Sequence, residues 1–375
     1  MIGVILVTGG RSHQEGYGAG FQADARCKVI AVTDETGIDE RRASLNRRLA
    51  EQLKVPYIAD IGDALRRADV HAASICTEHQ RQGRLSIRCA EAGKHLYVDK
   101  PLAGSLDEAR RLERVVRDNK LRSQMFTQVT LPPARRAKRL LASGQVGELR
   151  AIHHDLLFAK AHPADLALEP RKESAAPAPD RFLVPDAKRE MFNIAVYSLA
   201  LFRWISGRKP FRSVFAHTAN YFFEGSRARD MEDFGAMAVT LDGGISATAA
   251  AGRTGWRSHA GSGHHRIRLV GTRGSALVDA FAGRGEITAV GQPGWRVPET
   301  NPDDPMGFWA STDQKKTGSA EWYLPPPPLK SDQSFFLDCI ERGVDAEVTV
   351  ADGVRVLEVL FAAYRSAAEG RVVAL

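Results

Sequence analysis

Short apolar runs alternate with longer amphipathic segments along the first 125 residues. The runs at 2–8 (IGVILVT), 28–34 (KVIAVTD) and 70–77 (VHAASICT) are almost continuously apolar. Such continuity is typical of strands buried on both faces of a parallel sheet. Helix-length segments between the runs indicate β-α-β units. The pattern therefore predicts a Rossmann-like, doubly wound parallel sheet over residues 1–125.

A different pattern begins beyond residue 126. A helix is predicted over 131–150, closed by Gly144 and Gly147. Alternating strands follow at 150–160, 213–223, 233–252 and 264–280, with LDGG and GTRG as hairpin turns. Residues 126–375 are therefore expected to form a second domain of α+β class, with a large, mostly antiparallel sheet for substrate binding and oligomerisation.

The ends and connections of this second domain are also predicted. Residues 331–343 and 350–370 read as helices, and the last helix is expected to pack back toward the N-terminal domain. Residues 161–190 and about 291–330, rich in proline, read as two long loops.

Composition is that of an ordinary globular protein, with 375 residues, 43% of them hydrophobic. This length favours two domains. The opening MIGVILVTGG lacks the features of a signal peptide, and no apolar run reaches the roughly 18 to 20 residues of a membrane span. We therefore expect a cytoplasmic protein without membrane insertion. Its four cysteines have no Cys-x-x-Cys spacing, so neither a zinc site nor a disulfide framework is expected.

The formal charge of +7 raises the question of a nucleic-acid partner. Arginine is mixed with acids along helix-like segments such as RRLERVVRDNKLR, which indicates solvated helical faces instead. The positive field would also attract an anionic cofactor. A possible metal cluster at His153, His154 and Asp155 is rejected, because adjacent strand residues point to opposite faces. No metal is expected.

The turn after the first strand is a candidate nucleotide site. VTGGRS lacks an intact Gly-x-Gly-x-x-Gly and places Val7, Gly9 and Ser12 at the three glycine positions. Asp34 ends the second strand 25 residues after Gly9, near the usual spacing for an acid that binds the ribose. This acid favours NAD, while Arg41 and Arg42 keep NADP open. The residues expected to bind the cofactor here are Gly9, Gly10, Arg11, Ser12 and Asp34.

HLYVDKPLAG, residues 95–104, runs from an apolar strand into Lys100. Ligands bind at the carboxyl ends of the strands in a parallel sheet, so Lys100 lies where a substrate would. Pro101 stiffens the turn, and Asp99 could keep the ammonium charged. The alternative is a lysine that extends from a strand end to solvent.

EAGKHLYVDKPLAGSLDEARRL resembles the Glu-Lys-Pro segment of the GFO/IDH/MocA family, with Asp99 in place of the glutamate. Similar stretches recur in family order at ASICT, LLASGQVGEL, RWISG, HHRIRLVGTRGSALVD and FFLDCIERG. The resemblance implies an NAD(P)-dependent oxidoreductase acting on a sugar, sugar acid or cyclitol. It also implies a homodimer or homotetramer formed through the C-terminal sheet, with Lys100 beside the nicotinamide.

The family's Asp-x-Gly-x-His/Tyr motif corresponds to NIAVY, in which Asn193 and Ala195 replace Asp and Gly. The resemblance makes Tyr197 the candidate general acid/base, with its pKa lowered by Lys100. Gln82 and Thr130 stand where the family often has His and Arg. The implied catalytic residues are Lys100, Tyr197 and Asn193, the substrate residues add Gln128, and the cofactor residues add Thr77, Asp99 and Lys100.

Two other functions remain open from the sequence. One is an NAD-dependent glycosidase of the same family, and the other is a non-catalytic nucleotide sensor. RTGWRSH, with Arg253, Trp256, Arg257 and His259, could line a sugar site or form a loop rim or an oligomer contact.

Overall fold

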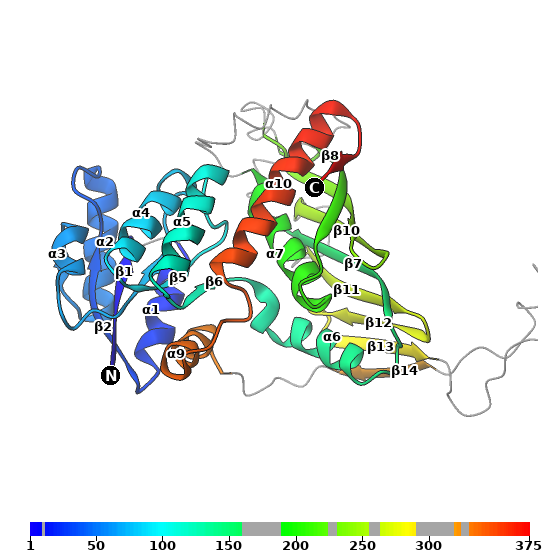
Figure 1. Cartoon of the computed structure of the whole chain (residues 1–375), viewed down its shortest axis with the longest axis horizontal. Coiled ribbons are helices and arrows are strands. Elements are labelled where there is room, and N and C mark those ends of the chain that lie inside the picture. Colours follow the sequence, from blue (N-terminus) through cyan, green and yellow to red (C-terminus); the bar gives the residue numbers. More distant parts are fainter. Residues whose placement is uncertain (10–11, 160–188, 224–230, 255–262, 290–318, 324–329) are drawn as a thin grey trace, which may run out of the picture.

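The computed structural model describes residues 1–9, 12–159, 189–223, 231–254, 263–289, 319–323 and 330–375. These residues form two sheets, with most of the helices between them or on the outer face of the first (Figure 1). The predicted fold class, a Rossmann-like sheet followed by a large, mostly antiparallel sheet, is confirmed.

The N-terminal sheet has six parallel strands in the order β3-β2-β1-β4-β5-β6. The strands are β1 (Ile2–Val7), β2 (Cys27–Thr33), β3 (Tyr57–Ile58), β4 (Ala72–Ile75), β5 (His95–Val98) and β6 (Ser123–Met125). The order reverses between β1 and β4. Such a switch point opens the crevice in which dinucleotides bind.

Helices connect these strands: α1 (Gln14–Gln22), α2 (Glu40–Leu53), α3 (Ile61–Leu65), α4 (His79–Glu91) and α5 (Leu106–Asp118). The side chains of Asp39, Asp60 and Ser105 accept backbone N–H groups at the starts of α2, α3 and α5. In the sequence SLDE, Ser105 and Glu108 have capping-box spacing, which predicts a helix start here, and the cap at Ser105 confirms it. These caps satisfy amides that the first helical turn leaves unpaired.

The second sheet has nine strands in the order β14-β13-β12-β11-β7-β10-β9-β8-β15. Among the pairings of its described strands, only that of β7 with β10 is parallel. The strands are β7 (Leu149–Phe158), β8 (Phe211–Ala219), β9 (Phe234–Leu241), β10 (Ile245–Arg253), β11 (Gly263–Gly271), β12 (Gly274–Asp279), β13 (Arg284–Ala289), β14 (Ser319–Tyr323) and β15 (Val373–Ala374).

One connection differs from its prediction. Residues 319–323, inside the stretch expected to be a loop, form β14, which pairs antiparallel with β13. Backbone hydrogen bonding to the edge of the sheet makes this segment a strand. The local sequence has no turn motif or apolar pattern that predicts a strand here. The proline-rich stretch 161–190 lies outside the described residues apart from its last two.

Five further helices complete the chain as described: the 3₁₀ turn η1 (Gln128–Thr130), α6 (Pro132–Ala142), α7 (Glu190–Ile205), α9 (Asp332–Arg342) and α10 (Val350–Glu369). Gly144 and Gly147 have φ of 72° and 73° after α6, as its predicted closure requires. Helix α7 is buried along nearly its whole length and packs on β10.

Two C-terminal helices contact the N-terminal half (Figure 1). Phe336 and Leu337 of α9 share a core with Phe21 of α1. Helix α10 packs on α5, where Arg110 contacts Glu358 at 3.1 Å. A domain boundary at residue 125 stays a prediction.

Candidate active site

The turn after β1 starts the switch-point crevice. Thr8 has φ of 67°, and a Cβ on Gly9 would lie 2.6 Å from the Leu49 side chain, so the turn passes close to α2. The Gly9 amide donates to Oδ1 of Asn46 at 2.8 Å. The Ser12 amide donates to Glu15 at 3.1 Å. The predicted cofactor residues Gly10 and Arg11 lie outside the described residues.

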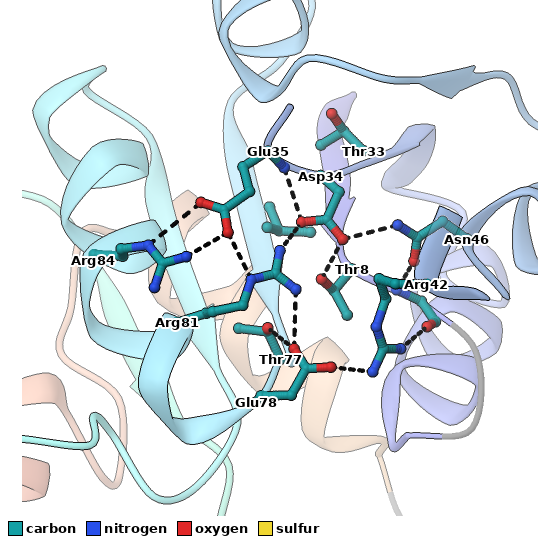
Figure 2. Close-up of polar contacts among 12 residues, drawn as sticks. Thr8, Thr33, Asp34, Glu35, Arg42, Asn46, Thr77, Glu78, Arg81 and Arg84 are labelled. Carbon is teal, nitrogen blue, oxygen red and sulfur yellow. Dashed lines mark hydrogen bonds and ion pairs between the residues drawn. The ribbon is translucent and has the colours of Figure 1, made fainter. Parts of the chain in front are cut away.

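Asp34 is fully buried at the end of β2, and four groups bind its carboxylate (Figure 2). Oδ2 accepts from the Thr8 hydroxyl and the Asn46 amide, both at 2.8 Å. Oδ1 accepts from the Glu35 amide at 2.8 Å and from Arg81. A carboxylate has about four acceptor positions, so Asp34 is saturated. Of its four donors, only Arg81 lies at the end of a long, flexible side chain.

Arg81 extends from α4 across the switch point, and its guanidinium contacts three carboxylates (Figure 2). Besides Asp34, it donates to Glu35 at 2.8 Å and to Glu78 at 3.0 Å. Arg42 of α2 pairs with the other oxygen of Glu78 and donates to the Gly9 carbonyl at 3.0 Å. These two arginines tie the β1–β2 side of the crevice to the β4–α4 side.

The same network includes Arg84, which binds Glu35. Three carboxylates thus face three guanidinium groups, so the formal charges balance. Burial raises the pKa of Glu78, but hydrogen bonds from its own amide and the Thr77 hydroxyl, with the charges of Arg42 and Arg81, lower it to about 2. The predicted cofactor residue Thr77 therefore lies at this network, as does Arg42, one of the two arginines that keep NADP open.

Lys100 is buried beyond the end of β5 and points toward α7. Its Nζ donates to Oδ1 of Asn193 at 2.6 Å and to the Asn193 carbonyl at 2.9 Å. The same Nζ lies 4.8 Å from the centre of the Tyr197 ring. Asn193 and Tyr197 are four residues apart and share one face of α7. The structure thus brings together the three side chains expected to be catalytic.

The prediction that Lys100 lowers the pKa of Tyr197 is wrong. The ammonium lies over the ring face, and burial raises the pKa of the phenol well above its usual value, with Asp99 and Cys76 acting in the same direction. Phe126 packs on the ring at 6.3 Å between centroids and contributes to its apolar surroundings. The Tyr197 hydroxyl is therefore protonated at neutral pH.

The Asp99 side chain contacts Tyr17 of α1 and His13, which precedes this helix. Its Oδ1 accepts from the Tyr17 hydroxyl at 2.7 Å and lies 3.2 Å from Nδ1 of His13. Burial raises the pKa of Asp99, but His13, Lys100 and Tyr17 lower it overall. The amide of Gln82 donates to the Asp99 carbonyl at 2.8 Å. Gln82 therefore holds the turn that positions Lys100.

The two predicted positions on η1 differ in their surroundings. Oε1 of Gln128 is buried without a hydrogen-bond partner among the described residues, and η1 packs on α7. It is thus available to a ligand. The Thr130 hydroxyl instead donates to Asp332 of α9 at 2.7 Å.

Glu190 and Arg253 lie at the start of α7 and the end of β10. Nε of Arg253 is 2.6 Å from Oε1 of Glu190. Burial raises the pKa of Glu190, and Arg253, Asn193 and Lys100 lower it only in part. Trp256, Arg257 and His259, which had been grouped with Arg253, lie outside the described residues.

Arg81, Glu190 and His13 were not singled out in the sequence. Arg81 and Glu190 stand in ordinary helix-start positions, and His13 follows the glycine turn without a motif of its own. Only its place directly after VTGGRS could have drawn attention to His13.

The two histidines considered as possible metal ligands, His153 and His154, have separate contacts. His153 contacts the Thr248 hydroxyl at 2.7 Å, whereas His154 contacts Ser198 of α7 at 2.9 Å. Within the described ranges, no three His, Cys, Asp or Glu side chains converge as metal ligands. Across the same part of the chain, every helix is too short or too polar to cross a bilayer.

Two family models match the chain. Residues 2–127 match the oxidoreductase family with an NAD-binding Rossmann fold, and residues 134–277 match the GFO/IDH/MocA C-terminal domain. Levoglucosan dehydrogenase of Pseudarthrobacter phenanthrenivorans is 30% identical over 82 residues, 22% of this chain and 21% of that protein. The 1-carboxy-3-chloro-3,4-dihydroxycyclohexa-1,5-diene dehydrogenase of Comamonas testosteroni is 29% identical over 134 residues, 36% and 32% of the two chains. The matches thus span at most a third of these relatives.

Solved structures match over the whole length. Levoglucosan dehydrogenase in complex with NADH and levoglucosan has a TM-score of 0.74 at 17% identity, covering 100% of this chain and 99% of that one. An oxidoreductase from Agrobacterium radiobacter in complex with NAD+, L-tartaric acid and magnesium also has a TM-score of 0.74, at 16% identity and 100% and 98% coverage. At these identities the likeness establishes the fold alone.

Proposed function

Because this chain belongs to the GFO/IDH/MocA family of oxidoreductases, we propose that it transfers a hydride between NAD(P) and a secondary alcohol or ketone of a sugar, sugar acid or cyclitol. The observation that carries this proposal is the meeting of Lys100, Asn193 and Tyr197 at the carboxyl end of β5. An ammonium and a protonated phenol side by side suit a substrate oxygen that gains and loses a proton.

The crevice fits a dinucleotide. Its strand order, its glycine turn and the acid that ends β2 are the features that hold a pyrophosphate and a ribose. Asp34 can accept a ribose hydroxyl only if one of its four donors leaves, and Arg81 is the side chain that can swing away. The cofactor, when bound, supplies the site that takes or gives the hydride.

Each of the chain's own residues then has a defined task. Lys100 holds the substrate oxygen and stabilises negative charge that develops on it, since its ammonium is buried in a medium of low dielectric constant. Asn193 fixes the ammonium without neutralising it. Tyr197, protonated in the resting chain, donates its proton to a carbonyl oxygen and takes it back in the reverse direction.

The direct test adds NAD and NADP separately to the purified protein. One measurement is the melting temperature with each cofactor. The other is the absorbance of NAD(P)H formed when hexoses, sugar acids or inositols are added. Stabilisation by a cofactor with reduction on one substrate is expected. Stabilisation without net reduction, together with cleavage of a glycoside, would indicate the glycosidase. Stabilisation with neither reaction would indicate a sensor.

We also propose a homodimer or homotetramer formed through the second sheet. Strands β7, β8 and β9 alternate buried with exposed or half-exposed residues, and Phe215 of β8 is 46% exposed. An apolar side chain on a broad, half-exposed sheet face suits contact with a second copy. Light scattering at micromolar concentration tests this proposal, and a monomer would contradict it.

A further inference from the structure

Glu190 is a buried carboxylate that the reaction described so far does not use. It begins α7, is 7% exposed, and lies one helical turn before Asn193 on the same face. Its Oε1 is 2.6 Å from Nε of Arg253. Its Oε2 is buried and has no hydrogen-bond partner among the described residues.

An unpartnered carboxylate oxygen in the interior carries a large desolvation cost. The contact with Arg253 does not remove this cost, because it reaches only the other oxygen, Oε1. The free oxygen can only accept, so its natural ligand is a donor such as a hydroxyl.

The position of Glu190 ties it to the reacting groups. Asn193 interacts with Glu190 on one side and accepts from Lys100 at 2.6 Å on the other. Lys100, Asn193, Glu190 and Arg253 therefore form a continuous polar row that leads away from Tyr197. A polyol whose reacting oxygen meets Lys100 would extend its neighbouring hydroxyls along this row.

We infer that Glu190 is a substrate-binding residue, whose Oε2 accepts a hydroxyl of the polyol adjacent to the one that Lys100 holds. This inference rests on the proposed dehydrogenase function. The only carboxylate of the row lies one turn of α7 before Asn193, the residue that accepts from Lys100, and the guanidinium of Arg253 favours its charged form. The substrate class it selects is a vicinal diol, because two neighbouring hydroxyls are needed to reach both residues.

The test compares E190Q with the unaltered chain on the polyol that gives the highest turnover. Glutamine keeps the shape but removes the charge. We expect kcat/KM to fall about 10- to 100-fold, the range for a lost hydrogen bond to a charged group. In the unaltered chain, protonation of Glu190, which lies near Arg253 and Lys100, should lower kcat/KM at acid pH. This acid limb of the kcat/KM profile should disappear in E190Q. With the unaltered chain, kcat/KM should be much lower for an analogue that lacks the adjacent hydroxyl than for the full polyol. With E190Q, the full polyol and the analogue should differ little in kcat/KM.

E232Q is the matched control: Glu232 is also buried, but its Oε1 accepts from Tyr364 at 2.5 Å and from the Met191 amide at 3.1 Å. It should lower the melting temperature without changing the preference for the diol.

The outcomes separate the two proposals. An E190Q variant that retains wild-type kcat/KM, or that only melts earlier with kcat/KM unchanged, would overturn the role of Glu190 and leave the dehydrogenase intact. Absence of reduction by the unaltered chain on every diol would overturn both.

Discussion

Nζ of Lys100 lies 2.6 Å from Oδ1 of Asn193, although the two residues are 93 positions apart in the chain. This bond joins the end of β5 to α7, at the proposed substrate site. Because the asparagine is neutral, it binds the Lys100 ammonium through hydrogen bonds without forming an ion pair. An aspartate there would instead share that charge in an ion pair.

Replacing Lys100 by methionine tests this charge. K100M should lower kcat by about 10²- to 10³-fold, since it removes the group that stabilises the developing oxyanion. NADH affinity, measured by fluorescence titration, should stay within a few-fold, because the adenosine end of the crevice is untouched. K100R keeps the charge but not the compact geometry and should also be impaired. Full activity in K100M would contradict the role of Lys100.

Tyr197→Phe separates proton transfer from packing. Phenylalanine keeps the contact with Phe126 and with the Lys100 ammonium, and only the hydroxyl is lost. We expect kcat to fall about 10²- to 10⁴-fold with little change in melting temperature. A variant that turns over normally would show that another group transfers the proton.

The main lines of the fold were predictable because each depends on a local pattern. Continuous apolar runs predicted the parallel strands. Capping chemistry accounts for the helix start at Ser105 and the helix closure at Gly144. Strand β14 was missed, since its pairing with β13 depends on a distant edge.

The site was only partly predictable. The resemblance at HLYVDKP and NIAVY indicated Lys100 and Tyr197, which the fold then brings together. The pKa of Tyr197 is raised and not lowered as predicted, because the effect of burial on the phenol outweighs that of a cation facing the ring. Arg81 meets Asp34 across 47 positions, and no local signal encodes such a contact.

The arginine over Asp34 should control the choice of cofactor. R81M removes the guanidinium that could bind a 2′-phosphate, so NADP affinity should fall at least about tenfold, while NAD affinity changes less. R84M is the matched control. Of Asp34, Glu35 and Glu78, Arg84 binds only Glu35, and its side chain is more exposed than that of Arg81. Dissociation constants for both cofactors measure the effect. An equal loss for NAD and NADP would show that Arg81 does not face the 2′ position.

Two buried histidines should make the fold sensitive to acid. Burial lowers the pKa of His265 to about 4 and lowers the pKa of His154 well below its usual value, and the rings lie 5.3 Å apart. In the unfolded chain both would bind protons near pH 6.5, so the folded state loses stability as pH falls from 6.5 toward 4. For His265 alone the loss is roughly 3 kcal/mol over that range. Denaturant titrations at pH 7 and pH 4 measure this loss, and H265Q should flatten the dependence of the unfolding free energy on pH. A free energy of unfolding with the same pH slope in H265Q would show that other groups cause the loss.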